Sequence, residues 1–402
     1  MDPRGSPYTP GAGIGPTVLV GRADVIESFD VMLDRLALGR SGTAPLVTGA
    51  RGSGKTVLHN ELLRRARNRG WYVAAEEAIA GAPLPALIAV MARDVLLQMR
   101  ATNRLSDRVK RALGVLKAFV SVSVAGIKLE INTDPVPGTA DTGILELDLR
   151  RLFVEIGEVA RSQGVGVLFA LDEVHTLPDA ALATVDTAIH GTAQRSLPVA
   201  FLGTGLFPSW KGTGLDDPTS TVTHRARTEV ERHVRLDPLN HVFSRLALIG
   251  PALVQRVRYD DNAAELAVRY CQGNPWLLQL VGDYAWRNAD TRRISYEAVR
   301  RSLAETEFRL GHTFFPRLLH ECDGDELEVL LAMAGTGQDT VPGHVLTRAD
   351  PSLVETRLLA LGRLAEKDFI VLAGYTSNIF HSAFEVQFSV PRLRAHLSNL
   401  HR

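Results

Sequence analysis

The stretch LVTGARGSGKTVL, residues 46–58, places three glycines and two cations between a short apolar run and a segment that can form a helix. It satisfies the pattern G-x-x-x-x-G-K-[ST] in the strand-to-helix context that this pattern needs, with the fixed positions Gly49, Gly54, Lys55 and Thr56. Glycines let successive backbone N–H groups turn inward as an anion nest, and the following helix N-terminus adds its positive dipole end. The stretch therefore predicts a phosphate-binding loop (P-loop), residues 49–56.

This P-loop predicts binding of ATP with Mg²⁺, because Lys55 can reach the terminal phosphates and the Thr56 hydroxyl can ligate the metal. A chance glycine-rich turn is the alternative. The four fixed positions would match by chance in on the order of one chain in a hundred of this length, and the strand–helix context lowers that further. The residues expected to contact the nucleotide are Gly49, Ala50, Arg51, Gly52, Ser53, Gly54, Lys55, Thr56 and Val57.

A second strand ending in acidic residues is expected with such a loop, and GVGVLFALDEVH, residues 164–175, supplies it. Asp172 is expected to hold Mg²⁺ through water, and Glu173 to polarise the attacking water. A strand that ends in a solvated acidic turn is the plain alternative. The acidic segment follows the P-loop by about 120 residues, and the two motifs together indicate an ATPase more strongly than either does alone. The sequence therefore predicts ATP hydrolysis as well as binding.

Two further candidates follow along the chain. The strand-like segment LPVAFLGTG, residues 197–205, ends near Thr204, which is expected either to contact the γ-phosphate or the water, or only to form a turn. Arg225 and Arg227 are candidates for an arginine finger on a neighbouring subunit, and a solvated basic face is the alternative.

The fold is predicted from the alternation of apolar runs with helical patterns. Apolar runs at 44–48, 71–75, 165–171 and 198–203 are separated by helical spacing, which predicts an α/β doubly wound parallel sheet. The segment FVSVSVAGIKLEIN, residues 119–132, alternates like a hairpin. The expected organisation is an extended arm (1–20), a nucleotide-binding α/β domain (21–240) with an insertion near 100–143, a helical domain (241–310) and a closing domain of helices and strands (311–402).

Composition excludes several classes of protein. The 402 residues carry 45 Lys plus Arg and 45 Asp plus Glu, so no global field favours nucleic acid or an anionic membrane. Two cysteines far apart exclude a disulfide scaffold and a thiolate zinc site. Apolar runs are too short to span a bilayer. We expect a cytoplasmic protein without a membrane partner.

Beyond these motifs, the chain resembles the AAA+ ATPases of the origin-recognition-like and archaeal-ATPase-like branch, in particular a bacterial, actinobacterial-type group. The resemblance covers most of the chain and rests on TPGAGIGPTVLVGR, GARGSGKTVL, ALDEVH, PVAFLGTGL and CQGNPWLLQLVGDYAW. It implies a P-loop NTPase with a helical lid and a C-terminal winged helix. It also implies that Gly21 and Arg22 lie near the adenine, and that a lid helix opening at Pro275 packs over the nucleotide. The family's lid arginine has no clear counterpart, because Arg287 lies too far along the helix.

The closing domain leaves two functions open. A winged helix normally places a helix in the major groove and its wing on phosphates. Residues 311–402 carry eight Lys plus Arg against eleven Asp plus Glu, and the segment 370–390 has no Lys or Arg. Phosphate contacts dominate DNA affinity. The charges therefore favour an ATPase switch with a protein partner or self-association, while the resemblance favours a DNA-associated remodeller. A basic run from Arg100 to Lys117 is the alternative DNA contact.

Overall fold

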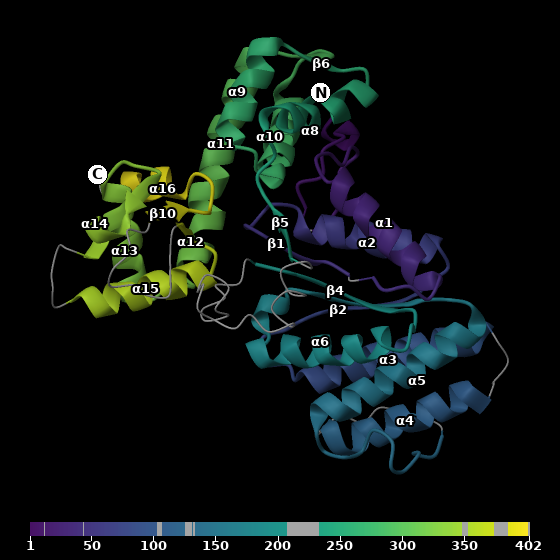
Figure 1. Cartoon of the computed structure of the whole chain (residues 1–402). Coiled ribbons are helices and arrows are strands. Elements are labelled where there is room, and N and C mark those ends of the chain that lie inside the picture. The colour runs from purple at the N-terminus through teal and green to yellow at the C-terminus, as the bar shows by residue number, and fades with distance from the viewer. Residues whose placement is uncertain are drawn as a thin grey trace.

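A computed structural model of the chain describes residues 1–402 except 12, 43, 103–106, 125–130, 132, 207–232, 348–352, 374–384 and 401–402 (Figure 1). Its centre is a five-stranded sheet of order β2-β3-β4-β1-β5, and all of its strand pairs are parallel. The strands are β1 (Leu46–Gly49), β2 (Tyr72–Glu77), β3 (Val167–Asp172), β4 (Val199–Gly205) and β5 (His233–Leu236). The predicted α/β parallel sheet is confirmed.

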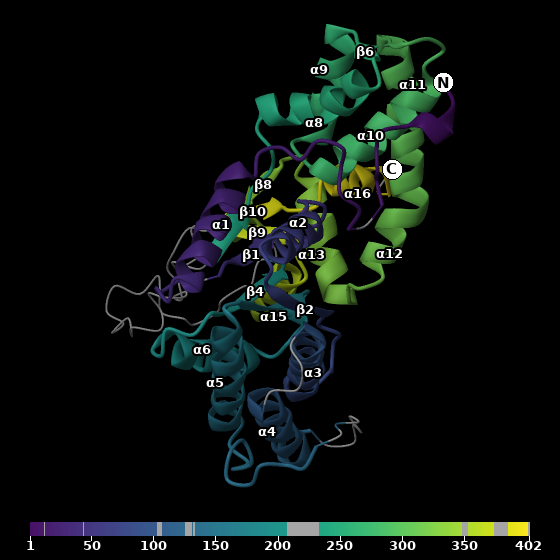
Figure 2. The same ribbon diagram turned by 90° about the vertical axis from the view of Figure 1, so that its right-hand side faces the viewer.

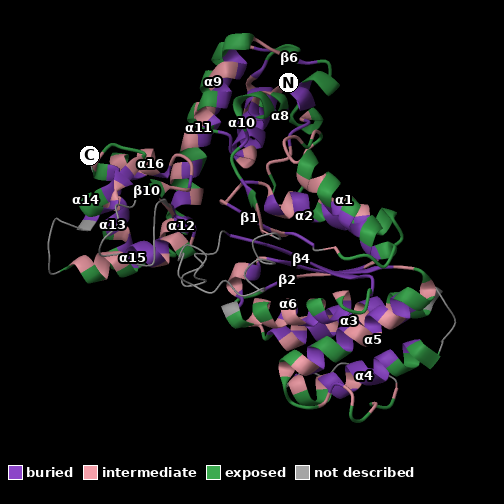
Figure 3. Cartoon of the chain, viewed as in Figure 1, coloured by how far each residue is buried: buried purple, intermediate pink, exposed green. Residues whose placement is uncertain are grey.

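Both faces of the sheet are covered because its strands are apolar on both sides. Along β3, Leu168 and Ala170 pack into one hydrophobic cluster, whereas Phe169 and Leu171 pack into another. Helices α1 (Ala23–Ala37) and α2 (Lys55–Asn68) lie over the first face (Figure 1). Helices α3 (Leu84–Thr102), α5 (Leu145–Gln163) and α6 (Asp179–Ala193) lie over the second face, and α4 (Asp107–Ser123) packs outside them against α3 and α5. The buried strands between these layers stand out in Figure 3.

The hairpin expected over 119–132 is wrong for its first part. Residues 119–123 are the last turns of α4, and Phe119 is fully buried with Leu113 and Leu116 at helical spacing. This face packs against α3 and α5, so burial at a spacing of three to four residues overrides the local alternation. Residues 125–130 and 132 lie outside the described part of the chain.

The next segment is helical, as expected from residue 241 onward. Its helices are α8 (His241–Val254), α9 (Asp261–Cys271), α10 (Pro275–Asn288) and α11 (Tyr296–Arg309). Two short strands, β6 (Arg258–Tyr259) and β7 (Arg293–Ile294), pair in parallel between them and carried no strand signal in the sequence. Asn274 caps the N-terminus of α10 by accepting a hydrogen bond from Leu277 N, and Pro275 occupies the first turn, where the helix implied by the sequence opens.

The N-terminal residues lie along α10 (Figures 1 and 2). They contain one 3₁₀ turn, η1 (Pro3–Gly5). Tyr8 is buried, and its hydroxyl donates to Leu248 O at 2.6 Å. The indole of Trp276 donates to Pro10 O at 3.1 Å, and that of Trp286 donates to Asp2 O at 2.9 Å. Tertiary hydrogen bonds thus fix a segment whose sequence reads as an extended arm.

The closing segment contains helices around a three-stranded antiparallel sheet of order β8-β10-β9. Its elements are η3 (Leu310–Phe314), α12 (Phe315–Leu319), α13 (Gly324–Gly335), β8 (Thr340–Pro342), α14 (Gly343–Thr347), α15 (Val354–Glu366), β9 (Ile370–Ala373), β10 (Glu385–Phe388) and α16 (Leu393–Leu400). The boundary expected near 311 is no loop, because the chain passes from α11 to α12 through the π-helical turn η3. One hydrophobic core extends from Leu239 to Leu397, so the helices on both sides of this turn pack together.

None of the helices in the described ranges is long and apolar enough to cross a membrane.

Candidate nucleotide-binding site

The P-loop joins β1 to α2, and two of its glycines adopt backbone conformations that other residues rarely adopt. Gly54 precedes the first turn of α2 with φ 90°, and Gly52 has φ 79°. A Cβ at Gly52 would also lie 2.8 Å from the side-chain oxygen of Asn274. The loop therefore needs glycine both for its turn and for the close approach of α10.

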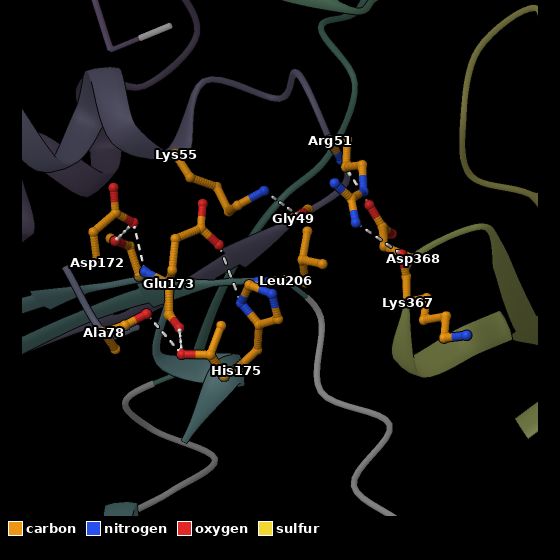
Figure 4. A network of polar contacts seen from close by, with 12 residues as sticks. Gly49, Arg51, Lys55, Ala78, Asp172, Glu173, His175, Leu206, Lys367 and Asp368 are labelled. Carbon is orange, nitrogen blue, oxygen red and sulfur yellow. Dashed lines mark hydrogen bonds and ion pairs between the residues drawn. The ribbon is translucent and has the colours of Figure 1, made fainter. Parts of the chain in front are cut away.

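Lys55 is the first residue of α2 and is only 7% exposed. Its ammonium donates to two carbonyls of the P-loop, Gly49 O at 2.8 Å and Ala50 O at 3.1 Å (Figure 4). Burial lowers the pKa of Lys55, and the charge of Asp368 opposes this shift more than any other group does. The cation is thus held inside the loop, where a phosphate would replace the carbonyls as its partner.

Asp172 ends β3, and its carboxylate is fixed from two sides. Oδ1 accepts Glu173 N at 2.9 Å and also accepts the hydroxyl of Thr204 on β4. His59 on α2 lies behind this pair, with Nδ1 at 3.1 Å from Thr204 Oγ1. Burial lowers the pKa of His59, so its neutral ring can donate from Nδ1 to the hydroxyl. Thr204 therefore orients Asp172, and it does so from a fully buried position.

Glu173 follows directly, with the left-handed φ of 56° that is uncommon for a residue with a side chain. Burial raises the pKa of Glu173, and the neighbouring Asp172 raises it further. Its Oε2 lies 3.2 Å from Nδ1 of His175, which also accepts Leu206 N at 3.3 Å. Burial lowers the pKa of His175 to about 4, so this imidazole is neutral at neutral pH and the pair is no ion pair. Glu173 is thus a half-buried carboxyl beside the P-loop, suited to proton transfer.

Lys55, Glu173 and His175 border a cavity of about 620 Å³, within the range of small-ligand sites, whereas Asp172 and Thr204 do not line it. Its apolar end is lined by residues of the N-terminal segment and the helical region, including Val18, Val20, Leu239, Ala247 and Leu277. The predicted contact residues that line it are Arg22, Arg51, Gly52, Ser53, Gly54, Lys55, Thr56, Val57, Glu173 and Pro275. A polar loop at one end and apolar side chains at the other suit a phosphorylated ligand with a flat base.

Arg22 and α10 connect the walls of this cavity. The Arg22 guanidinium donates to Ser53 O at 3.2 Å and to Asp237 O at 3.0 Å. From α10, Trp276 N donates to Gly52 O at 3.2 Å and Asn274 Nδ2 donates to Arg51 O at 3.1 Å. Gly21, next to Arg22, has φ 69° and approaches Leu239. The helical region is therefore hydrogen-bonded directly to the P-loop.

The closing segment reaches the same loop, although no sequence pattern indicated it. Arg51 N donates to Asp368 Oδ2 at 2.7 Å, from the turn between α15 and β9 (Figure 4). The Arg51 guanidinium forms an ion pair with Glu321 at 3.0 Å. Phe314, Val390 and Pro391 complete this side of the cavity. The candidate site thus lies between the sheet, α10 and the closing segment.

The residues that sequence reasoning missed are His59, His175 and Asp368. His175 stands in the ALDEVH motif, so its closeness to Glu173 could have been inferred from spacing. His59 lies on the first turns of α2, where its burial is a tertiary fact. Asp368 had no local signal at all.

Other predicted residues lie elsewhere. Arg225 and Arg227 lie outside the described part of the chain. Arg287 forms an ion pair with Asp283 at 2.6 Å on α10 and does not line the cavity.

The oxygen ligands suit Mg²⁺ without forming a complete protein cage. Among the described residues, no group of three or more His, Cys, Asp or Glu side chains could hold a metal ion. Mg²⁺ usually keeps several waters and binds one or two protein groups together with substrate phosphates. The Thr56 hydroxyl and the Asp172 carboxylate fit that pattern, because Thr56 lines the cavity beside Lys55 and Asp172 stands at the carboxyl end of β3 in the same parallel sheet.

Comparison with known proteins agrees with this geometry. The model of the AAA ATPase domain matches residues 18–202, somewhat less than half of the chain. No curated protein matches the chain significantly. Among solved structures, the Walker-type ATPase of Pyrococcus abyssi is 17% identical, with 94% of this chain and 96% of that chain covered and a TM-score of 0.52.

Two further solved structures are similar over most of their length. The ORC1 protein of Aeropyrum pernix in complex with DNA is 15% identical, with coverages of 96% and 94% and a TM-score of 0.45. Cdc6p of Pyrobaculum aerophilum is 14% identical, with coverages of 97% and 96% and a TM-score of 0.45. The parallel sheet and its P-loop, together with the match of residues 18–202 to the AAA ATPase domain, support a nucleotide-dependent ATPase with the P-loop NTPase fold.

Proposed function

We propose that the chain binds and hydrolyses ATP and acts as a molecular switch, in which the nucleotide controls the position of the closing segment. The observation that carries this proposal is the hydrogen bond from Arg51 N to Asp368 Oδ2 at 2.7 Å, because it joins the closing segment to the phosphate-binding loop itself. A change of ligand in the loop must then act on that contact. A switch of this kind needs no cation-rich surface for DNA.

The roles of the site residues follow from their chemistry. Lys55 is proposed to bind the terminal phosphates, and Thr56 and Asp172 to hold Mg²⁺, which would neutralise phosphate charge. Glu173 is proposed as the base that activates water, because burial brings its pKa closer to neutrality. Thr204 is proposed to position Asp172 rather than to touch the phosphate, since its hydroxyl already donates to that carboxylate.

The nucleotide base is proposed to occupy the apolar end of the cavity, against Gly21, Arg22 and the first turn of α10 at Pro275. Arg225 and Arg227 stay candidates for a finger supplied to a neighbouring subunit, on the sequence alone. The domain boundaries at 20, 240 and 310 are also proposed, with 310 falling inside a continuous helical run.

A winged helix is proposed for residues 311–402, supported by α13, α14 and α15 beside the antiparallel sheet β8-β10-β9. Its excess of acidic residues argues against phosphate contacts. A DNA-associated remodeller is the second candidate, supported by Arg108, Lys110 and Arg111, which are exposed on α4. Part of that charge is neutralised, because Lys110 lies 3.7 Å from Asp107 and Arg111 lies 3.3 Å from Glu155. Arg104 lies outside the described residues.

The switch is tested by measuring the distance between α1 and α14. Val31 and Val345 are half exposed on these helices, so cysteines placed there can carry spin labels in a Cys322→Ser background. Addition of ATP and Mg²⁺ to the Glu173→Gln chain, which should bind without turnover, is expected to change the distance distribution.

The matched control adds Lys55→Ala to the same labelled chain, which should remove the response to ATP. Identical distance distributions without nucleotide, with ADP and with ATP, under conditions where a titration shows binding, would rule out the switch. If labelled duplex binds only in the presence of ATP, and Arg108→Ala with Arg111→Ala abolishes binding, the DNA-associated function takes its place.

A further inference from the structure

Asp368 is a buried carboxylate that belongs to the closing segment but faces the P-loop. It lies in the turn between α15 and β9 with φ 58°, and it is 3% exposed. Ser389 donates its hydroxyl to Asp368 O, and Ser389 N donates to Phe369 O at 3.0 Å, so the strand region after β10 fixes this turn from behind. A buried carboxylate held this firmly is costly unless it has a partner.

That partner is the backbone of the phosphate-binding loop. Arg51 N–H, which donates to Asp368 Oδ2, belongs to the loop whose backbone N–H groups form the anion nest of a P-loop. Asp368 thus places a negative charge against the backbone of this loop. Among the described residues of the closing segment, Asp368 alone accepts a hydrogen bond from the P-loop backbone.

The same carboxylate acts on Lys55. Among the charges that favour the protonated ammonium of Lys55, Asp368 contributes more than Glu173 or Asp172. Burial raises the pKa of Asp368, and the hydrogen bond from Arg51 N and the charge of Lys55 oppose this rise. The P-loop lysine binds the terminal phosphates. An additional phosphate bound by Lys55 would therefore be repelled by Asp368, the carboxylate that acts most strongly on Lys55.

We propose that Asp368 is a specificity-determining residue, which makes the site discriminate against a third phosphate while the closing segment is docked. A nucleoside diphosphate leaves the contact between Asp368 and Arg51 intact. A nucleoside triphosphate adds negative charge beside Asp368, so binding it costs the release of this carboxylate and, with it, of the closing segment. This inference rests on the proposed function and names the group that senses the phosphate.

A neighbouring carboxylate provides a contrast. Glu321 forms an ion pair with the Arg51 guanidinium, but its side chain is 46% exposed and it makes no contact with the P-loop backbone among the described residues. Solvent screens such a pair. Glu321 therefore helps the closing segment to dock on Arg51 without placing a charge in the nest.

The test is a calorimetric titration of the full chain with ADP and with ATPγS, each with Mg²⁺. Asp368→Asn keeps the size of the side chain and an oxygen for Arg51 N, and it removes the charge. We expect ATPγS to bind at least about tenfold more tightly to this variant, which corresponds to about 1.4 kcal/mol, and ADP to bind within about threefold of its original affinity.

Two variants separate this effect from docking and from net charge. Glu355→Gln removes one negative charge from the exposed first turn of α15, the helix that leads to Asp368, and should leave the ratio of the two affinities unchanged. Glu321→Gln weakens docking but leaves the Asp368 carboxylate at the P-loop, so it should tighten ATPγS binding by less than Asp368→Asn does and leave ADP binding within about threefold. An unchanged ratio in Asp368→Asn, with both ligands bound by the original chain, overturns the inference alone. Failure of the original chain to bind either nucleotide overturns the proposed function instead.

Hydrogen exchange of the original chain gives a second measurement that needs no variant at position 368. The amides of residues 366–370, which include the bond from Phe369 N to Leu364 O at 2.9 Å, should exchange at similar rates without nucleotide and with ADP. Saturating ATPγS should accelerate their exchange at least about tenfold, because the turn leaves the P-loop. Full protection of this turn at saturating ATPγS would overturn the inference even if Asp368→Asn did not fold.

Discussion

Replacement of Lys55 by methionine should separate nucleotide binding from the stability of the fold. Methionine keeps the length and most of the volume of the side chain but removes the ammonium, which is almost fully buried and donates to Gly49 O and Ala50 O. Loss of two hydrogen bonds from a charged donor costs about 3–6 kcal/mol at about 1.5–3 kcal/mol each. Removal of a buried charge returns several kcal/mol of desolvation free energy. The free energy of unfolding without nucleotide should therefore change by less than about 2 kcal/mol.

The pH dependence has a defined sign. The pKa of Lys55 is lowered in the folded chain, so the unfolded chain binds this proton more tightly. The resulting penalty on the folded state is complete at neutral pH and is relieved as pH rises from the lowered pKa toward the ordinary value of 10.5. The stability of Lys55→Met relative to the original chain should be most favourable at neutral pH and decline in that alkaline window.

Nucleotide affinity should respond very differently. Without the ammonium, a phosphate in the P-loop loses a charge-assisted partner, and a loss of about 3 kcal/mol corresponds to more than about a hundredfold in affinity. Calorimetric titration with ATPγS and Mg²⁺ measures this loss, and thermal unfolding measures stability. Lys110→Met, at an exposed lysine of α4, is the matched control and should change neither quantity appreciably. Undiminished affinity of Lys55→Met would refute the assignment of the phosphate site. A loss of stability far above about 2 kcal/mol would show that the desolvation free energy regained does not offset the two lost hydrogen bonds.

Two further predictions concern hydrolysis. Glu173→Gln should keep ATP affinity and slow turnover by about a hundredfold or more, since a positioned base is lost; turnover at the original rate would mean that another group activates the water. In the original chain, turnover at saturating ATP should fall as pH drops through the raised pKa of Glu173, at a pH above the ordinary value of 4.5, because the base must be deprotonated. His175 should not cause this fall in turnover, because burial lowers its pKa to about 4. A pH-rate profile of Glu173→Gln that lacks the acidic fall would support Glu173 as the base.

The sequence by itself determined the features that depend on local chemistry. The P-loop could be read because only glycine tolerates φ 79° and 90° at positions 52 and 54, and because the strand-to-helix context is encoded in neighbouring residues. The central strands were predictable because strands buried on both faces are continuous apolar runs. Asp172 and Glu173 could be placed beside the loop because carboxyl ends of parallel strands meet at one edge of the sheet. β5 was less visible, since only Leu236 of this edge strand is buried.

Tertiary structure alone decided which distant groups act on these motifs. Asp368 contacts Arg51 across 317 positions of the chain, and no periodicity or spacing encodes such a contact. The neutral state of His175 and the raised pKa of Glu173 depend on burial by residues from several elements, which desolvates the charged forms. Helix α4 was misread for the same reason, because its alternating residues acquire a helical face only when α3 and α5 cover them. Local backbone preference fixes a turn or a strand, whereas burial and charge at a site are sums over the whole packed chain.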